Sequence, residues 1–138
     1  MAEHRAPRAN GRQKGQAVIE FAMAVGVMML LVVGLFDLGR AVAAYSAVSH
    51  AAREGARAAL YVSYGDNQIR NAVRSEAVAL PGLSDGDIVI TPDESHRHAG
   101  DTVTVRVNYR FQAATPMIDR FLPAGGLALT AAGTAVVQ

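Results

Sequence analysis

The chain has 138 residues, a formal net charge of +1 and no cysteine, and 51% of its residues are hydrophobic. This length accommodates one small domain with an anchor, not two independent globular units. The absence of cysteine excludes a disulfide framework and catalysis by a thiol. Tryptophan is also absent, so the hydrophobic residues are mainly alanine, valine and leucine, which suit closely packed helices.

Residues 1–15 form a basic segment. Arg5, Arg8, Arg12 and Lys14 outweigh Glu3 by +3, whereas the remainder has nine basic and eleven acidic residues, a balance of −2. Positive flanks of a membrane span are retained in the cytoplasm, so we expect a cytoplasmic N-terminus. A nucleic-acid-binding arm is the alternative interpretation of such a cluster, but the apolar run directly after it favours the membrane.

This apolar run is interrupted by a single acidic residue, Glu20. Residues 17–36 would span about 30 Å as a helix, which is the thickness of the hydrocarbon core of a bilayer. We therefore predict a transmembrane helix over this range. Asp37 and Arg40 follow one turn apart without a helix breaker. The sequence thus predicts one long helix over residues 16–62, whose second half lies outside the lipid.

A stripe of small side chains follows the span at every fourth position. Its members are Ala43, Ala47, Ala51, Gly55 and Ala59. Stripes of this kind let another backbone approach closely, and such an approach would explain a glycine that costs a helix about 1 kcal/mol relative to alanine. The stripe can pack against the helix of another subunit or against the chain's own sheet, and both alternatives remain open at this point.

Residues 63–138 are expected to form an external domain. The pattern predicts a second helix that Asp66 or Asn67 caps and Pro81-Gly82 ends, followed by three strands. We expect the strands over residues 87–91, 102–111 and 127–137, with a turn or short helix over 115–122. The predicted fold class is α+β: a long N-terminal helix with one further helix and a roughly three-stranded antiparallel sheet. A domain this small is marginal alone, so we expect it to dock on the long helix.

No enzymatic site is predicted. The histidines of the polar loop could bind a divalent metal together with nearby carboxylates, but the His-x-His spacing is weak evidence and solvated residues are the simpler interpretation. The residues concerned are His96, His98, Asp93, Glu94 and Asp101. Ser49-His50 lacks a third group to orient the imidazole as a catalytic triad requires. No phosphate-binding loop or dinucleotide fingerprint occurs, so we expect no catalytic residue, metal or cofactor.

Two segments of the first half carry a family resemblance. They are GQAVIEFAM at Gly15–Met23 and FDLGRAVAAYSAVSHAAREGARAALY at Phe36–Tyr61. Together with the span between them, they resemble the TadE-like proteins, which are pilin-like minor subunits of tight-adherence (Tad) secretion and pilus systems. The resemblance implies that a prepilin peptidase cleaves the leader between Gly15 and Gln16. It further implies an anchor in the bacterial inner membrane, an extracytoplasmic domain, and a non-enzymatic role in pilus assembly with other pilin-like subunits and the Tad machinery.

The position of Glu20 suggests a role in that assembly. A carboxylate inside a span is costly and by default marks a functional position. After cleavage, Gln16 would carry a free α-amino group one turn away or on a neighbouring subunit, and pairing with Glu20 would lessen the cost of both charges. The alternative is that Glu20 lies shallowly and reaches the cytoplasmic interface.

Two other interpretations of the whole chain remain. Ala41-Val42-Ala43 resembles a signal-peptidase site, and cleavage there would release a soluble domain. However, the apolar stretch exceeds the usual 7–15 residues of a signal peptide, and Asp37 and Arg40 separate it from the site. Alternatively, an unprocessed single-span envelope protein would bind a ligand or sense its surroundings through the polar loop 92–101.

Overall fold

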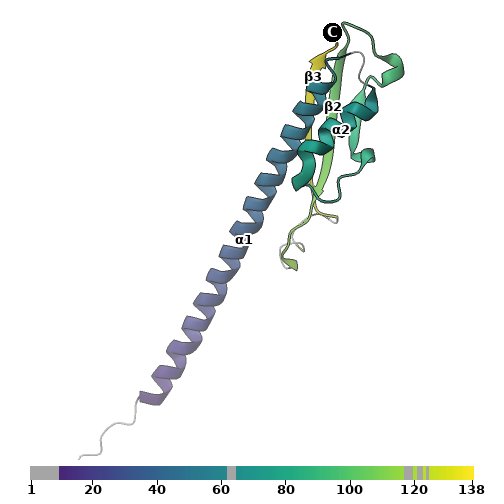
Figure 1. Ribbon diagram of the computed structural model, residues 1–138. Helices are drawn as coiled ribbons and strands as arrows, with labels where there is room; N and C mark the ends of the chain where they lie inside the picture. Colours follow the sequence, from purple (N-terminus) through teal and green to yellow (C-terminus); the bar gives the residue numbers. More distant parts are fainter. Residues whose placement is uncertain (1–9, 62–64, 117–119, 121–122, 124) are drawn as a thin grey trace, which may run out of the picture. The chain divides into compact units, whose positions relative to one another are not determined.

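The computed structural model describes residues 10–61, 65–116, 120, 123 and 125–138 (Figure 1). The chain divides into two compact units, Met1–Phe36 and Asp37–Gln138. A single helix, α1 (Asn10–Ala58), runs through both units. It begins before residue 16 and ends before residue 62, because Ala59 and Leu60 form a turn after its last residue.

The second unit contains the remaining elements, which confirm the predicted α+β class. They are α2 (Asp66–Glu76), β1 (Ile88–Thr91), β2 (Thr102–Phe111) and β3 (Leu127–Val136). Short 3-10 helices cover Ala77–Ala79, Asp85–Asp87 and Glu94–His96. The predicted turn or short helix over residues 115–122 falls in large part on residues 117–119 and 121–122, which lie outside the described residues.

The three strands form one antiparallel sheet in the order β1-β2-β3. The register pairs Ile90 with Val105 and Val105 with Gly133. Side chains alternate along β2, so that Val103 and Val105 are fully buried while Arg106 is exposed. This alternation is the one that the sequence predicted, because successive residues of a strand point to opposite faces.

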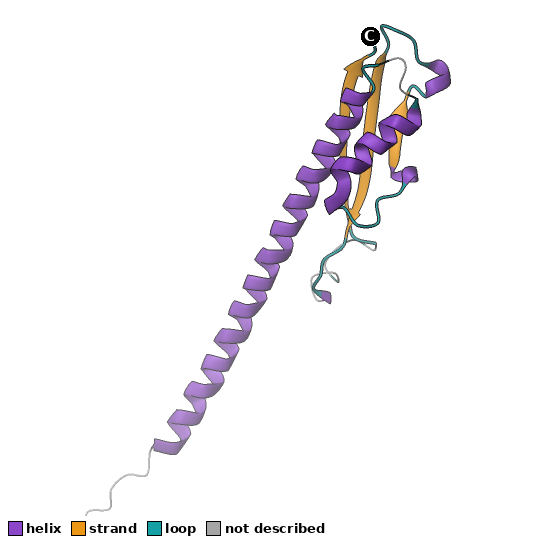
Figure 2. Cartoon of the chain, in the orientation of Figure 1, coloured by secondary structure: helices purple, strands orange, loops and turns teal. Residues whose placement is uncertain are grey.

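Both helices cover the same face of the sheet (Figure 2). From α1, Val48 and Ala52 are completely buried, and from α2, Ile69 and Val73 are completely buried. These side chains join the apolar face of β2 in one core. The outer part of α1, residues 37–58, therefore belongs to the domain core.

Small residues let α1 lie close to its neighbours. A Cβ atom added to Gly55 would lie 2.5 Å from Val73 Cγ2 and 2.9 Å from Val105 Cγ1. On β3, a Cβ added to Gly133 would collide with the carbonyl oxygen of Ala52. Both glycines are thus required by close packing within the domain, which accounts for the helix-propensity cost of Gly55.

The start of α2 differs from the expected capping arrangement. Gly65 is the N-cap residue and provides no side-chain cap, while Asp66 is the first helical residue. The carboxylate of Asp66 instead accepts a hydrogen bond of 2.5 Å from Arg97 Nη2. Oδ1 of Asp66 is thus engaged in a long-range ion pair with Arg97.

We expect Gly55→Leu to destabilise the domain, because the new side chain would displace Val73 and Val105. Overpacking of this kind costs about 1–3 kcal/mol. Denaturant unfolding of the detergent-solubilised full chain, followed by near-ultraviolet circular dichroism of its tyrosines, would measure the change in the free energy of unfolding. Gly39→Leu is the matched control, because a Cβ added at Gly39 meets nothing within 4 Å. Equal stabilities of the two variants would contradict the packing assigned to Gly55.

Candidate processing and assembly site

The predicted processing residues lie in α1. Gly15, Gln16 and Glu20 are exposed, and a Cβ added to Gly15 would meet nothing within 4 Å. Within the described residues, no hydrogen bond or ion pair involves Glu20. The carboxylate therefore has no partner in the described part of its own chain.

Residues 17–36 are apolar and largely exposed. Phe21, Leu31 and Leu35 are 71%, 68% and 70% exposed. Among the described residues, one helical segment, Gly15–Ala58, is long and apolar enough to cross a membrane, and its most apolar stretch is not buried. Exposed apolar surface of this extent marks a lipid or protein interface. The helix is thus compatible with a single-pass membrane anchor.

Asp37, the first residue of the second unit, is buried with 4% of its surface exposed. Its Oδ1 accepts a hydrogen bond of 3.1 Å from the backbone N–H of Ala114, and its Oδ2 accepts one of 3.2 Å from that of Thr115. Arg40 Nη1 lies 3.2 Å from Asp37 Oδ1, and the Arg40 guanidinium lies 5.3 Å from the centroid of the Phe111 ring. Asp37 and Arg40 together fasten α1 to the end of β2 and the segment after it.

The sequence analysis located Asp37 and Arg40 at the end of the span but did not identify this attachment. The spacing of three residues indicates an ion pair on one helix face. The backbone amides of Ala114 and Thr115 are 77 and 78 residues away in sequence, so no local pattern points to them.

The structure separates the stripe of small residues into parts. Ala51, Gly55 and Ala59 are buried in the core of the second unit. Ala47 is half-buried and Ala43 is exposed. The distal part of the stripe therefore packs inside the domain, and its proximal end remains accessible to another helix.

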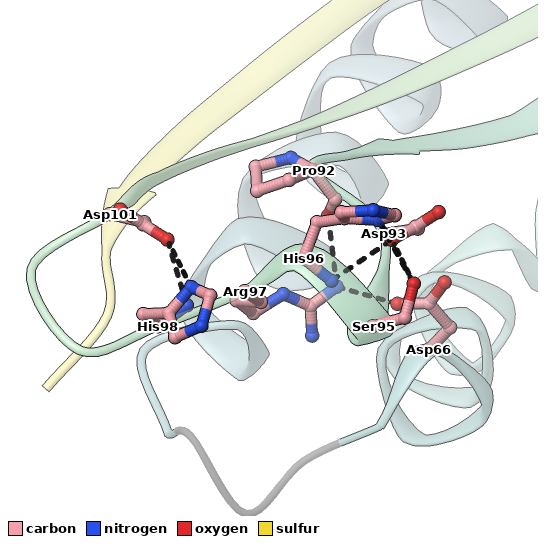
Figure 3. A network of polar contacts seen from close by, with 8 residues as sticks. All are labelled: Asp66, Pro92, Asp93, Ser95, His96, Arg97, His98 and Asp101. Atoms are coloured by element: carbon pink, nitrogen blue, oxygen red, sulfur yellow. Dashed lines mark hydrogen bonds and ion pairs between the residues drawn. The ribbon is translucent and has the colours of Figure 1, made fainter.

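The polar loop after β1 is held by its own contacts (Figure 3). A hydrogen bond of 2.6 Å joins His96 Nδ1 and Asp93 Oδ1, and the Ser95 hydroxyl donates a hydrogen bond of 2.8 Å to the same oxygen. The hydrogen bond with His96 is the main cause that lowers the pKa of Asp93 below its ordinary value of 3.8, and the bond from Ser95 adds to it.

The two histidines do not converge on a common point in this loop. His98 Nδ1 lies 3.5 Å from Asp101 Oδ2, whereas His96 faces Asp93. No group of three or more potential metal ligands occurs among the described residues. Between the histidines, buried Arg97 donates hydrogen bonds to Asp66 Oδ1 at 2.5 Å and to the carbonyl of Pro92 at 3.3 Å (Figure 3). These contacts tie the loop to the start of α2.

The Ser49-His50 pair lies on α1, where His50 is exposed and Ser49 is half-buried. Over the described ranges, no hydrogen bond or ion pair links the His50 ring to a carboxylate. The arrangement thus offers no orienting group of the kind that a catalytic triad uses.

Comparison with known families gives a match over part of α1. The family model described as TadE-like protein matches residues 15–57. This segment begins at Gly15 and ends one residue before the end of α1. The predicted resemblance is thus confirmed over the long helix. Searches of curated proteins and of solved structures found no match.

We expect Asp37→Asn to loosen the attachment of α1 to the segment after β2. The amide lacks the charge that pairs with Arg40 and has a single acceptor oxygen for two backbone donors, so the loss should be about 1–3 kcal/mol. The rate of hydrogen exchange should increase more at the amides of Ala114 and Thr115 than at the amides of β2.

Glu54→Gln is the matched control, because it removes another carboxylate of α1 that pairs with an arginine three residues away, at 3.8 Å and with a more exposed side chain. An exposed pair contributes at most about 1 kcal/mol. Unchanged exchange at Ala114 and Thr115 in the Asp37→Asn protein would show that this carboxylate does not hold the segment.

Proposed function

We propose that this protein is a TadE-like minor pilin or pseudopilin, a non-enzymatic subunit for assembly of a Tad-type pilus. The match of residues 15–57 to the TadE-like family carries this proposal. The subunit is anchored in the bacterial inner membrane by residues 17–36, with residues 1–15 in the cytoplasm and the domain of residues 63–138 outside it. Its partners are a prepilin peptidase, other pilin-like subunits and the Tad assembly machinery.

The charge distribution around the span supports this orientation. The leader carries an excess of three positive charges, and such flanks remain cytoplasmic. The prepilin peptidase removes this leader after Gly15. The scissile bond lies where the basic segment meets the apolar run, at the cytoplasmic edge of the proposed span.

The unpartnered state of Glu20 supports a role in assembly. In lipid, an ionised carboxylate requires a partner charge or hydrogen-bond donors. The α-amino group of Gln16, generated by cleavage, supplies a positive charge one helical turn away or on an adjacent subunit. Pairing of the two therefore couples processing to assembly.

The outer part of α1 offers a surface to a partner subunit. Leu38, Val42 and Tyr45 are more than half exposed, and their spacing of four and three residues places them on one face of the helix. Leu31 and Leu35 continue the same spacing into the span. A seam with this period packs against a second helix, and the long helix of another pilin-like subunit is the partner that we propose.

The signal-peptidase alternative conflicts with the packing of α1. Cleavage after Ala43 would remove Asp37 and Arg40, which contact Ala114, Thr115 and Phe111. A domain released in this way would lose the contacts between α1 and the end of β2. The packing therefore favours an uncleaved α1 over signal-peptidase cleavage.

Processing after Gly15 predicts a defined mass. The full chain, co-expressed with its cognate prepilin peptidase and extracted from membranes, should have lost residues 1–15 in intact-mass spectrometry. Gly15→Leu should retain the leader, because a bulky side chain fills the space at the scissile bond, whereas Gly26→Leu, in the same helix, should be processed normally. An N-terminus at Met1 in the wild-type protein would contradict processing, and one at Ala44 would support signal-peptidase cleavage.

Glu20→Gln should impair assembly without impairing insertion or cleavage. The neutral side chain costs less in lipid, and the charge lies beyond the scissile bond, so membrane extraction and intact mass should be unchanged. Co-purification with partner subunits and the number of pili per cell should fall. Glu54→Gln, outside the span, is the control. Normal piliation by the processed Glu20→Gln protein would contradict the pairing with the Gln16 amine. It would support the alternative, in which Glu20 reaches the cytoplasmic interface.

A further inference from the structure

β3 forms one edge of the sheet, because the strand order is β1-β2-β3. It has ten residues and contains neither a charged residue nor a proline. Its pairing with β2 continues without a bulge from Leu127 to Val136. An edge strand with these properties is a template for pairing with another chain, because nothing in it disrupts the row of outer backbone groups.

A hydrogen bond at the end of β3 shows which backbone groups face outward. The N–H of Val137 donates to the carbonyl of Asp101, directly before β2, over 3.0 Å. Backbone groups of an antiparallel strand alternate in direction, so odd-numbered residues of β3 face β2 and even-numbered residues face away from it. Within the described part of the chain, no hydrogen bond reaches these outward backbone groups. The residues that carry them are exposed: Ala128, Thr130, Ala132, Thr134 and Val136.

The opposite edge of the sheet offers much less to a partner. β1 has only four residues, and by the same alternation the backbone groups of Ile88 and Ile90 face away from β2. The N–H of Ile88 donates to the carbonyl of Asp85, and its carbonyl accepts a hydrogen bond of 2.8 Å from Arg70 Nη1. Short and covered edge strands protect a sheet against pairing with other chains. The domain therefore protects one edge and leaves the other open.

From this contrast we propose that β3 accepts an extended segment of another pilin-like subunit as a fourth strand of the sheet. Main-chain hydrogen bonds to the outward groups of β3 supply the affinity in this mode of recognition. β3 offers no charge to pair with, which favours a segment without charged side chains. The proposal rests on the proposed function, which supplies the other subunits.

The direction of β3 argues against a second copy of this chain as the partner. Leu127 pairs with Phe111, whose ring lies beside Arg40, and the N–H of Gln138 donates to the carbonyl of Leu60. β3 thus runs in the same direction as the outer part of α1. Two copies that paired through β3 about a twofold axis would hold these strands, and hence their α1 helices, antiparallel. Subunits that enter one membrane through the same end of α1 have parallel helices.

Ala132→Pro should block the added strand, because proline lacks the N–H that faces the open edge and its ring takes that place. Proline is tolerated in an edge strand where the N–H faces solvent, so near-ultraviolet circular dichroism of the tyrosines should be unchanged. The processed full chain, in detergent, is titrated with purified pilin-like subunits of its own Tad system. We expect its apparent affinity to fall about tenfold, because the partner loses a hydrogen bond. Ala132→Val is the matched control, because it keeps the N–H, and it should bind like the wild-type protein.

Hydrogen exchange separates strand addition from contact through side chains alone. In the complex, the amides of Ala128, Thr130, Ala132 and Thr134 should exchange about tenfold more slowly, whereas the odd-numbered amides of β3, already bonded to β2, should change little. Unchanged exchange at the outward amides, or equal binding by the two variants, would overturn the inference and leave the proposed function standing. Slower exchange at these amides in the protein alone, as its concentration rises, would overturn the choice of partner by identifying a second copy. Failure of the wild-type protein to bind any of these subunits would refute both proposals.

Discussion

The domain depends on the burial of the outer part of α1 against one face of a three-stranded sheet. Val103, Val105 and Val107 of β2 are completely excluded from solvent. A sheet of three strands exposes such a face unless helices cover it, and α2 has only eleven residues. The last turns of α1 therefore supply the remaining cover, so that one helix contains both the exposed apolar segment and a part of the domain core.

This arrangement explains why small residues recur on α1. The distance between packed helix axes is about 8–10 Å and depends on the side chains at the contact. At Gly55, which has no side chain, the backbone of α1 comes within contact of Val73 and Val105. Gly133 performs the same function from the side of the sheet, where it faces the carbonyl of Ala52. Close approach from both sides lets a domain with few aromatic residues fill its core. Substitutions on this face thus report on folding, whereas Ala43, which is exposed, can report on association.

The parts of the fold that local patterns control were predictable from the sequence. The strand over residues 102–111 was recognised because its apolar residues alternate, and its bounds match those of β2. The start of α2 was predicted less well, because Asp66 pairs with Arg97, 31 residues away, and does not cap the helix. The attachment of Asp37 to Ala114 and Thr115 was not predictable for the same reason. Contacts between distant segments depend on the folded arrangement, and no spacing within either segment encodes them. The candidate processing residues stay a prediction, which rests on the order of residues where the basic segment meets the apolar run.

Two carboxylates of α1, those of Asp37 and Glu20, differ in their exposure and in their partners. Asp37 is buried, and its charge is met by Arg40 and by two backbone amides of the same domain. It stabilises the folded domain, and its burial keeps it away from solvent. Glu20 lies inside the apolar run, exposed and without a partner among the described residues. An ionised group in lipid either acquires a counter-charge or becomes neutral. Under the proposed function, the counter-charge of Glu20 is the α-amino group of Gln16, on its own chain or on an adjacent subunit, and this charge exists only after the leader has been removed.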